Sequence, residues 1–189
     1  NKGESLESNY ILSLEENSLG DVYIGTHSGG LTIVKHDGSV NTYHITKDDA
    51  GVLIFNIHLD ENDNVWVVSN LGLYLFENNV FKKIKLQVIN KGETYFDWLE
   101  DNEHNVWITT NLGVLKIEHQ DILNFFEGED SVVHTKLYDN HDGMKNKECT
   151  GATRSLVSSK GELWIPTLGG VAVFSPQKII KNELPPPVY

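Results

Sequence analysis

Short apolar runs recur along the chain and are separated by polar clusters. The runs 11–14, 54–57 and 95–98 mix β-branched, aromatic and leucine residues, as strands do. Each precedes a polar pentad, "NSLGD", "DENDN" or "DNEHN", and then a second apolar run. Asp, Asn and Gly tolerate tight hairpin turns. The pattern therefore predicts antiparallel hairpins, and only 119–128 and 176–182 suggest a helical period.

One segment of ten residues occurs twice in the chain with few differences. The two copies are "NVWVVSNLGL", which begins at Asn64, and "NVWITTNLGV", which begins at Asn105. More divergent copies are "DVYIGTHSGGL" and "ELWIPTLGGV". The anchor aromatics of the four copies, spaced by 43, 41 and 57 residues, are Tyr23, Trp66, Trp107 and Trp164. Repeats of about 40 to 45 residues with several strands each are typical of propeller blades.

The strands of each copy can be counted from the same pattern. A first strand precedes the polar turn, a second carries the anchor, a glycine turn and a third strand follow, and a variable fourth strand closes the unit. We predict an all-β fold of four blades, each with four antiparallel strands and the first strand nearest the propeller axis. The expected blades are 8–47, 51–88, 92–122 and 132–176.

The anchor aromatics have a structural explanation. A single small sheet that is apolar on both faces cannot bury itself, so neighbouring blades must stack. Trp66, Trp107 and Trp164 are then packing residues, nearly fully buried between blades. Their indole N–H groups need partners, and carbonyls at strand ends are the expected acceptors.

The shared sequence motif resembles the two-component regulator propeller repeat. The motif reads I-x-x-L/I-x-x-D-x-x-x-N-V-W-I-x-T-x-x-G-L/V. The second and third copies match closely, whereas the first has Tyr23 for Trp and the fourth has Ser158 for Asp and Pro166 for Gly. The tail resembles the last blade of such a sensor, with "DGM" at 142–144, an F-x-P element at 174–176 and prolines at 185–187.

The resemblance implies the sensor region of a hybrid two-component regulator with a histidine kinase, placed in the periplasm. Residues 1–180 would be the C-terminal part of a larger propeller, and 181–189 a linker toward a missing β-sandwich. Such sensors recognise oligosaccharides or other small ligands. The chain is then not an enzyme, because kinase activity and membrane contact belong to missing parts.

Composition narrows the choice of partners. The chain of 189 residues carries 15 basic and 27 acidic residues, a net charge of -12. An acidic surface repels phosphate backbones and anionic lipid, so we expect no nucleic acid partner. The single cysteine, Cys149, is interpreted as a small buried residue. The sequence holds no apolar run of about eighteen or more residues that would span a membrane.

Catalytic and metal motifs are weak. The turn from Asp60 to Asn64 opens like a calcium loop but has Val65 and Leu71 where glycine and an acid are needed. The eight histidines are scattered and form no helical metal-binding pair. We therefore predict no catalytic residue, no metal and no cofactor.

Candidate ligand-binding residues lie near one expected face of the propeller. Trp98 stands where the earlier copies have Leu14 and Ile57, so its ring is either a packing adjustment or a surface for stacking on a sugar. A ligand should lie over the second turns and the links between blades. The candidates are Asn70, Tyr95, Trp98, Asn111 and Arg154.

Two alternative functions remain open from the sequence alone. A propeller enzyme of the streptogramin-lyase type shares an aromatic after a glycine turn, and a protein-interaction scaffold is also compatible. Four blades are fewer than the seven or eight usual for such sensors. Because open ends expose apolar faces, we also predict that the chain either closes with distortion or self-associates, with two copies forming an eight-bladed pseudo-ring.

Overall fold

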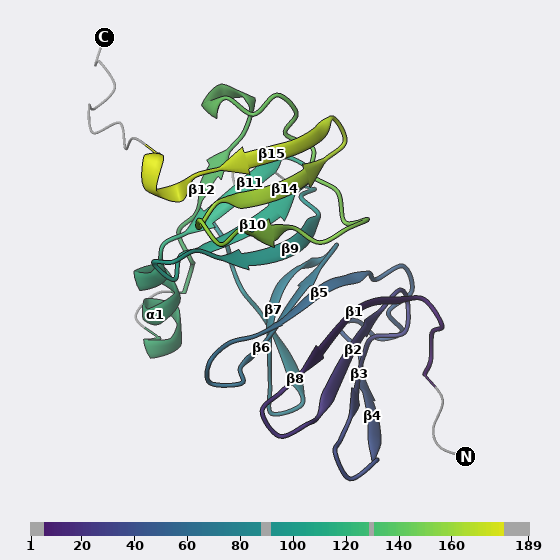
Figure 1. Cartoon of the computed structure of the whole chain (residues 1–189). Helices are drawn as coiled ribbons and strands as arrows, with labels where there is room; N and C mark the ends of the chain where they lie inside the picture. The colour runs from purple at the N-terminus through teal and green to yellow at the C-terminus, as the bar shows by residue number, and fades with distance from the viewer. Residues whose placement is uncertain (1–5, 88–91, 129–130, 180–189) are drawn as a thin grey trace.

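A computed structural model describes residues 6–87, 92–128 and 131–179, which form four antiparallel sheets arranged as blades of a β-propeller (Figure 1). Blade 1 consists of β1 (Ile11–Glu16), β2 (Val22–Thr26), β3 (Leu31–Val34) and β4 (Val40–Tyr43). Blade 2 consists of β5 (Ile54–Leu59), β6 (Val65–Ser69), β7 (Gly72–Glu77) and β8 (Val80–Lys83). The predicted all-β propeller fold with four blades is confirmed.

Blade 3 is interrupted by a helix. It consists of β9 (Tyr95–Glu100), β10 (Val106–Thr110), β11 (Gly113–Ile117) and β12 (Lys136–Tyr138), with α1 (His119–Glu127) before the last strand. The expected range 92–122 stopped before β12, which pairs with β11. The inserted helix displaces the fourth strand along the sequence into the range expected for the next blade.

Blade 4 has three strands in the described part of the chain. They are β13 (Leu156–Val157), β14 (Leu163–Thr167) and β15 (Gly170–Phe174), flanked by short 3-10 helices at Asn140–Asp142 and Pro176–Lys178. The expectation of four strands in every blade is therefore met in blades 1 to 3 only. β15 is left as an edge strand in this sheet.

The first strands of the blades lie side by side. β1 contacts β5, β5 contacts β9, and β9 contacts β13, while the later strands of each sheet follow outward in sequence order. Figure 1 shows the four sheets fanned out in this order from the purple to the yellow end of the chain. The prediction that the first strand is innermost agrees with these contacts.

The polar pentads all form one kind of turn. The first side chain accepts hydrogen bonds from backbone N–H groups two and four residues later, as Asp101 does from Glu103 at 2.9 Å and Asn105 at 3.0 Å. The fourth residue takes a left-handed conformation, with φ between 58° and 81° in the four turns. Glycine, Asp and His occupy that position, and these residues tolerate the left-handed conformation. Pentads of different sequence can therefore form the same turn.

The indole groups bond to these turns rather than to strand-end carbonyls. Trp107 Nε1 donates to Asp101 Oδ2 at 2.8 Å, and Trp66 Nε1 donates to Asp60 Oδ2 at 3.2 Å. The predicted carbonyl acceptor is therefore wrong. In blades 2 and 3 the first residue of the turn is an aspartate, which uses one oxygen for the backbone and its second oxygen for the indole six residues later.

Apolar clusters fill the three spaces between adjacent blades. Trp66 and Trp107 are 1% and 0% exposed, as predicted. The same prediction is wrong for Trp164, which is 43% exposed on the outer face of blade 4. An anchor is buried only when a further blade stacks on its sheet, and no described residue forms such a blade beyond blade 4.

Asp21 should make the stability of blade 1 sensitive to acid. Lys35 Nζ lies 2.8 Å from its carboxylate and the backbone N–H of His36 lies at 3.0 Å. The hydrogen bond from Lys35, then that from His36, lowers the pKa of Asp21 from 3.8 to about 2. A lowered folded-state pKa stabilises the fold above the unfolded-state value and ceases to do so as pH falls through the folded-state value.

The Asp21→Asn variant should therefore lose the part of the pH dependence that lies between about pH 4 and pH 2. Urea unfolding across this range should show a shallower fall in unfolding free energy than the original chain shows. Asp37→Asn is a useful comparison, because the backbone N–H of Ser39 also lowers the pKa of this exposed carboxylate, so this variant should show a smaller change of the same sign. Identical pH slopes for Asp21→Asn and the original chain would contradict the assignment.

Candidate functional site

The innermost strands carry polar residues at one shared register position. Ser13 on β1, Asn56 on β5 and Asp97 on β9 each lie four residues before the first residue of their turns, and Arg154 matches them before β13. Ser13, Asn56 and Asp97 are 5%, 2% and 4% exposed. A polar residue inside each apolar run was the sequence signal for this arrangement, and sequence reasoning missed it.

Asp97 joins three blades. Its carboxylate accepts a short hydrogen bond from the side-chain amide of Asn56 in blade 2. It also accepts from the backbone N–H of Ser155 at 2.5 Å, just before β13 of blade 4. A buried carboxylate with several N–H donors replaces part of the hydration it loses. The inner strands are thus tied together by polar contacts as well as by packing.

Several buried polar atoms around these strands have no partner. They are Asn56 Oδ1, His58 Nε2, Trp98 Nε1, Thr109 Oγ1 and Ser155 Oγ. Thr109 is the cross-strand partner of Asp97 on β10. We call Asn56, His58, Asp97, Trp98, Thr109 and Ser155 the axial site. Within the described residues, one further unpartnered side-chain atom of this kind belongs to Glu93. Buried polar atoms normally have partners, so the axial site is suited to hold buried water.

Charged side chains form a partly exposed rim beside the axial site. Arg154 Nη2 lies 2.9 Å from Glu15 Oε1, which connects the start of blade 4 to β1. His58 Nε2 lies 3.9 Å from Glu100 Oε2, and His104 Nδ1 lies 2.5 Å from Glu100 Oε1. Burial lowers the pKa of His58 despite the nearby Glu100, whereas the hydrogen bond to Glu100 raises the pKa of His104. His58 is therefore neutral at pH 7.

Trp98 packs between two other rings. Its centroid lies 4.9 Å from that of Trp66 and 5.1 Å from that of His58, which stacks on it at 17°. Trp98 is 7% exposed and belongs to the apolar cluster between blades 2 and 3. The geometry favours the packing interpretation for the ring and leaves its indole N–H as the group without a partner.

Two other predicted residues hold the links between blades. Asn70 Oδ1 accepts from Leu53 N at 2.8 Å while its amide donates to Gly51 O at 3.0 Å. Asn111 does the same for its own link, accepting from Thr94 N at 2.8 Å. These contacts show how the "NLG" turns fix the entry of the chain into the next first strand.

Tyr95 lies at the link before blade 3. Its hydroxyl donates to Glu93 Oε2 at 3.1 Å beside a cavity of about 340 Å³. Burial raises the pKa of both Tyr95 and Glu93. The five predicted residues are thus not gathered in one place: Asn70, Tyr95 and Asn111 are engaged at the links, and Trp98 and Arg154 lie at or beside the axial site.

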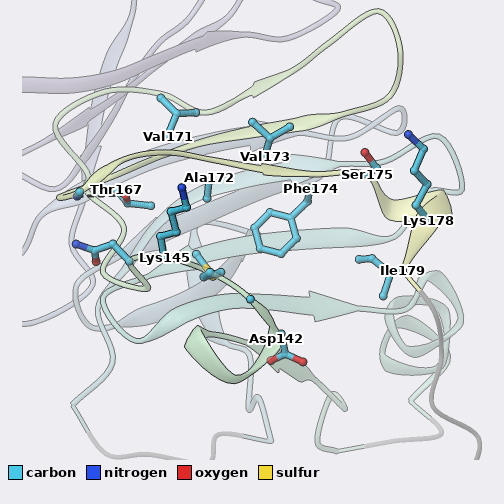
Figure 2. Close-up of a pocket in the computed structure, with 14 residues that line it drawn as sticks. Asp142, Lys145, Thr167, Val171, Ala172, Val173, Phe174, Ser175, Lys178 and Ile179 are labelled. Atoms are coloured by element: carbon cyan, nitrogen blue, oxygen red, sulfur yellow. Dashed lines mark hydrogen bonds between the residues drawn. The ribbon is translucent and has the colours of Figure 1, made fainter.

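A cavity of about 550 Å³ lies along β15. Five consecutive residues, 171–175, line the cavity. Alternate side chains of a strand point to opposite faces of the sheet. The cavity therefore reaches both faces of β15 around the unpaired edge of this strand. Figure 2 shows the Phe174 ring pointing into this space, with Lys178 and Ile179 beside it and Asp142 on the opposite wall. The lining mixes charged, polar and apolar groups.

Neither a metal centre nor a spanning helix is found within 6–87, 92–128 and 131–179. No cluster of three or more His, Cys, Asp or Glu side chains in these ranges could hold a metal ion. None of the helices described there is long and apolar enough to cross a membrane.

No family model matches the chain, and no curated protein matches it. Among solved structures, it is similar to the extracellular domain of the hybrid two-component system BT3049 from B. thetaiotaomicron. The identity is 24%, the match covers 89% of this chain and 20% of that chain, and the TM-score is 0.65. For BT4673 of the same organism, the match has 13% identity, covers 91% of this chain and 22% of that chain, and gives a TM-score of 0.68.

Propeller enzymes are similar as well. Virginiamycin B lyase from Staphylococcus aureus matches with 16% identity over 87% of this chain and 55% of that chain, at a TM-score of 0.60. The chain spans about a fifth of the length of the two extracellular domains. Likeness at these identities shows the fold, and the chain has the β-propeller fold of the extracellular domains of hybrid two-component systems.

Proposed function

We propose that this chain is a ligand-sensing propeller module of a hybrid two-component regulator, positioned in the periplasm, and that its ligand is an oligosaccharide bound at the axial site. The observation that carries the proposal is the group of buried polar atoms without partners on and beside the innermost strands. A ligand hydroxyl that reaches these atoms would take the place of the buried water that such atoms commonly hold. Binding at the axis also touches several blades at once, so it can change how the blades pack.

The chemistry of the axial site suits hydroxyl groups, which both donate and accept. Asn56 Oδ1 is an acceptor, the Trp98 indole N–H is a donor, and Ser155 Oγ can do either. Around them the rim offers Arg154 together with Glu15 and Glu100. The net charge of -12 disfavours polyphosphates as ligands. Asn70, Tyr95 and Asn111 stay a prediction for a ligand that extends over the links.

An oligosaccharide screen tests this proposal. Ligands found by thermal shift would be measured by titration calorimetry against the original chain, Arg154→Ala and Lys160→Ala. Arg154 lies on the rim, whereas Lys160 is an equally exposed cation in the turn before β14. We expect Arg154→Ala to weaken binding about tenfold, a loss of about 1.4 kcal/mol, and Lys160→Ala to leave it unchanged. Equal effects of the two substitutions on affinity, or no binding of any oligosaccharide, would contradict the proposal that the axial site binds the ligand.

A lyase is the second candidate, and His58 favours it. The ring is neutral at pH 7 and its Nε2 has no hydrogen-bond partner, as a general base requires. Quinupristin, the compound bound to a virginiamycin B lyase variant in a solved structure, is the probe to use. Chromatography should show no conversion by this chain under the sensor proposal. Conversion that disappears in His58→Ala would establish the lyase instead.

A further inference from the structure

A cavity lies where blade 2 meets the link that leads into blade 3. It measures about 340 Å³, and its described walls come from the start of β7, the segment after β8 and the link before β9. Pockets that bind small ligands span about 300 to 1,000 Å³. We call this space the link cavity. It shares no lining residue with the axial site, and its apolar walls are Leu71, Leu73, Ile84 and Leu86.

Glu93 lines the link cavity at a position that is apolar in the matching link of blade 2. Asn70 and Asn111 hold the two links with the same pair of hydrogen bonds, and this aligns Val52 with Glu93. Val52 is 3% exposed and packs in the apolar cluster between blades 1 and 2, whereas Glu93 is 8% exposed. Packing of a link therefore accepts an apolar residue here, and the buried carboxylate of blade 3 needs another explanation.

The carboxylate of Glu93 is only half engaged. Oε2 accepts a hydrogen bond from the Tyr95 hydroxyl at 3.1 Å, whereas Oε1 is buried and has no hydrogen-bond partner among the described residues. None of the ion pairs in the described part of the chain includes Glu93. Burial raises the pKa of Glu93 against the opposing hydrogen bond from Tyr95. Buried water can donate to Oε1, but only a cation also neutralises the buried charge.

The border of the link cavity carries the opposite charge. Lys83 and Lys85 line the cavity and are exposed. The ammonium group of Lys83 donates to the carbonyl oxygen of Leu71 at 2.7 Å, which holds it at this border. From inside to outside, the cavity therefore offers a carboxylate, apolar walls and two ammonium groups.

We propose that the link cavity binds a small apolar amino acid in its zwitterionic form. The ammonium group of the ligand pairs with Glu93 Oε1, its apolar side chain lies against Leu73 and Ile84, and its carboxylate faces Lys85. Each charged group of the ligand then meets a charge of opposite sign, and the apolar part leaves water. Such a site is independent of sugar binding at the axial site.

Titration calorimetry at neutral pH with three probes of one carbon skeleton tests the charge pattern. Leucine carries both charged groups, 3-methylbutylamine lacks the carboxylate, and 4-methylpentanoate lacks the ammonium group. We expect leucine to bind most tightly and the amine more weakly. 4-Methylpentanoate should not bind, because it brings a second carboxylate close to Glu93. No binding of leucine, or equally tight binding of 4-methylpentanoate, would overturn the proposal.

Variants of Glu93 test the inner charge. Glu93→Gln keeps the size of the side chain and should weaken leucine binding about ten- to a hundredfold, the range for a hydrogen bond to a charged group. Glu93→Val introduces the residue of the matching link, so it should fold and bind no leucine. Glu77→Gln, which changes an exposed carboxylate at the end of β7, is the matched control and should leave the affinity unchanged. Unchanged affinity in Glu93→Gln would contradict the proposal.

Lys85→Ala tests the charge at the border. It should weaken the binding of leucine and leave that of 3-methylbutylamine unchanged, because only leucine has a carboxylate. Equal losses for the two probes would contradict this orientation of the ligand.

Nuclear magnetic resonance then locates the bound leucine. The backbone N–H signals of Gly92 and Tyr95 should shift and saturate, while the indole N–H signal of Trp98 at the axial site stays in place. A saturable shift of the Trp98 signal with Gly92 and Tyr95 unchanged would place leucine at the axial site and overturn the proposal.

Discussion

Replacing Trp107 with alanine should lower the free energy of unfolding by about 3 to 5 kcal/mol, the range for removing a fully buried tryptophan. The ring is 0% exposed and packs against Tyr138 of its own blade at 5.4 Å and Phe174 of blade 4 at 5.9 Å. Its loss leaves a cavity between blades 3 and 4. It also removes the indole donor from Asp101, which lies 2.8 Å away.

Trp164→Ala is the matched comparison, because this tryptophan occupies the same place in the repeat but is 43% exposed. Urea unfolding followed by circular dichroism, at a concentration where both variants are monomeric, should show a much smaller loss for Trp164→Ala. Equal losses would mean that the two positions contribute alike, and that packing between blades is not what stabilises the anchor.

Replacing Asp97 with alanine should have the second large effect, a loss of about 2 to 3 kcal/mol. The side-chain amide of Asn56 and the backbone N–H of Ser155 both lose their acceptor, and each buried donor left unpaired costs about 1 to 3 kcal/mol. The net loss stays below the sum because removing a buried carboxylate also removes its desolvation cost.

Asp97→Asn separates these two contributions. The amide keeps the shape of the side chain and one acceptor oxygen, so it should lose less stability than Asp97→Ala if hydrogen bonding dominates. A variant more stable than the original chain would show that desolvation of the buried charge dominates. Glu61→Ala, at an exposed position in the turn of blade 2, should change the unfolding free energy by less than about 0.5 kcal/mol.

The repeat made most of the fold predictable. The sequence around Trp66 and Trp107 contains, within a few residues, a turn, a strand and the tryptophan that bonds to the turn. Local sequence was therefore sufficient to predict these blades. β12 was misplaced because α1 separates it from the strand it pairs with, and pairing across an insertion has no local signal. The exposure of Trp164 was missed because burial depends on a neighbouring blade rather than on the residue itself.

The site was less predictable than the fold. Asn70 and Asn111 were chosen as polar residues at the expected mouth, but each is engaged by the link that it holds. Asp97 was not among the candidates, because a single acid within an apolar strand is compatible with the ordinary alternation of strand faces. Comparing the same position in Ser13, Asn56 and Asp97 would have found it, since a buried apolar strand is not expected to repeat a polar residue at one register position.

Nuclear magnetic resonance of the isotope-labelled chain, titrated with an oligosaccharide selected by the thermal-shift screen, tests binding at the axial site most directly. The indole N–H of Trp98, the side-chain amide of Asn56 and the backbone N–H of Ser155 give separate signals around the inner strands. We predict that these three signals shift together and saturate with one dissociation constant. Saturable shifts confined to residues 142–146 and β15, with the signals of the inner strands unchanged, would place the ligand in the cavity beside β15 and contradict binding at the axis.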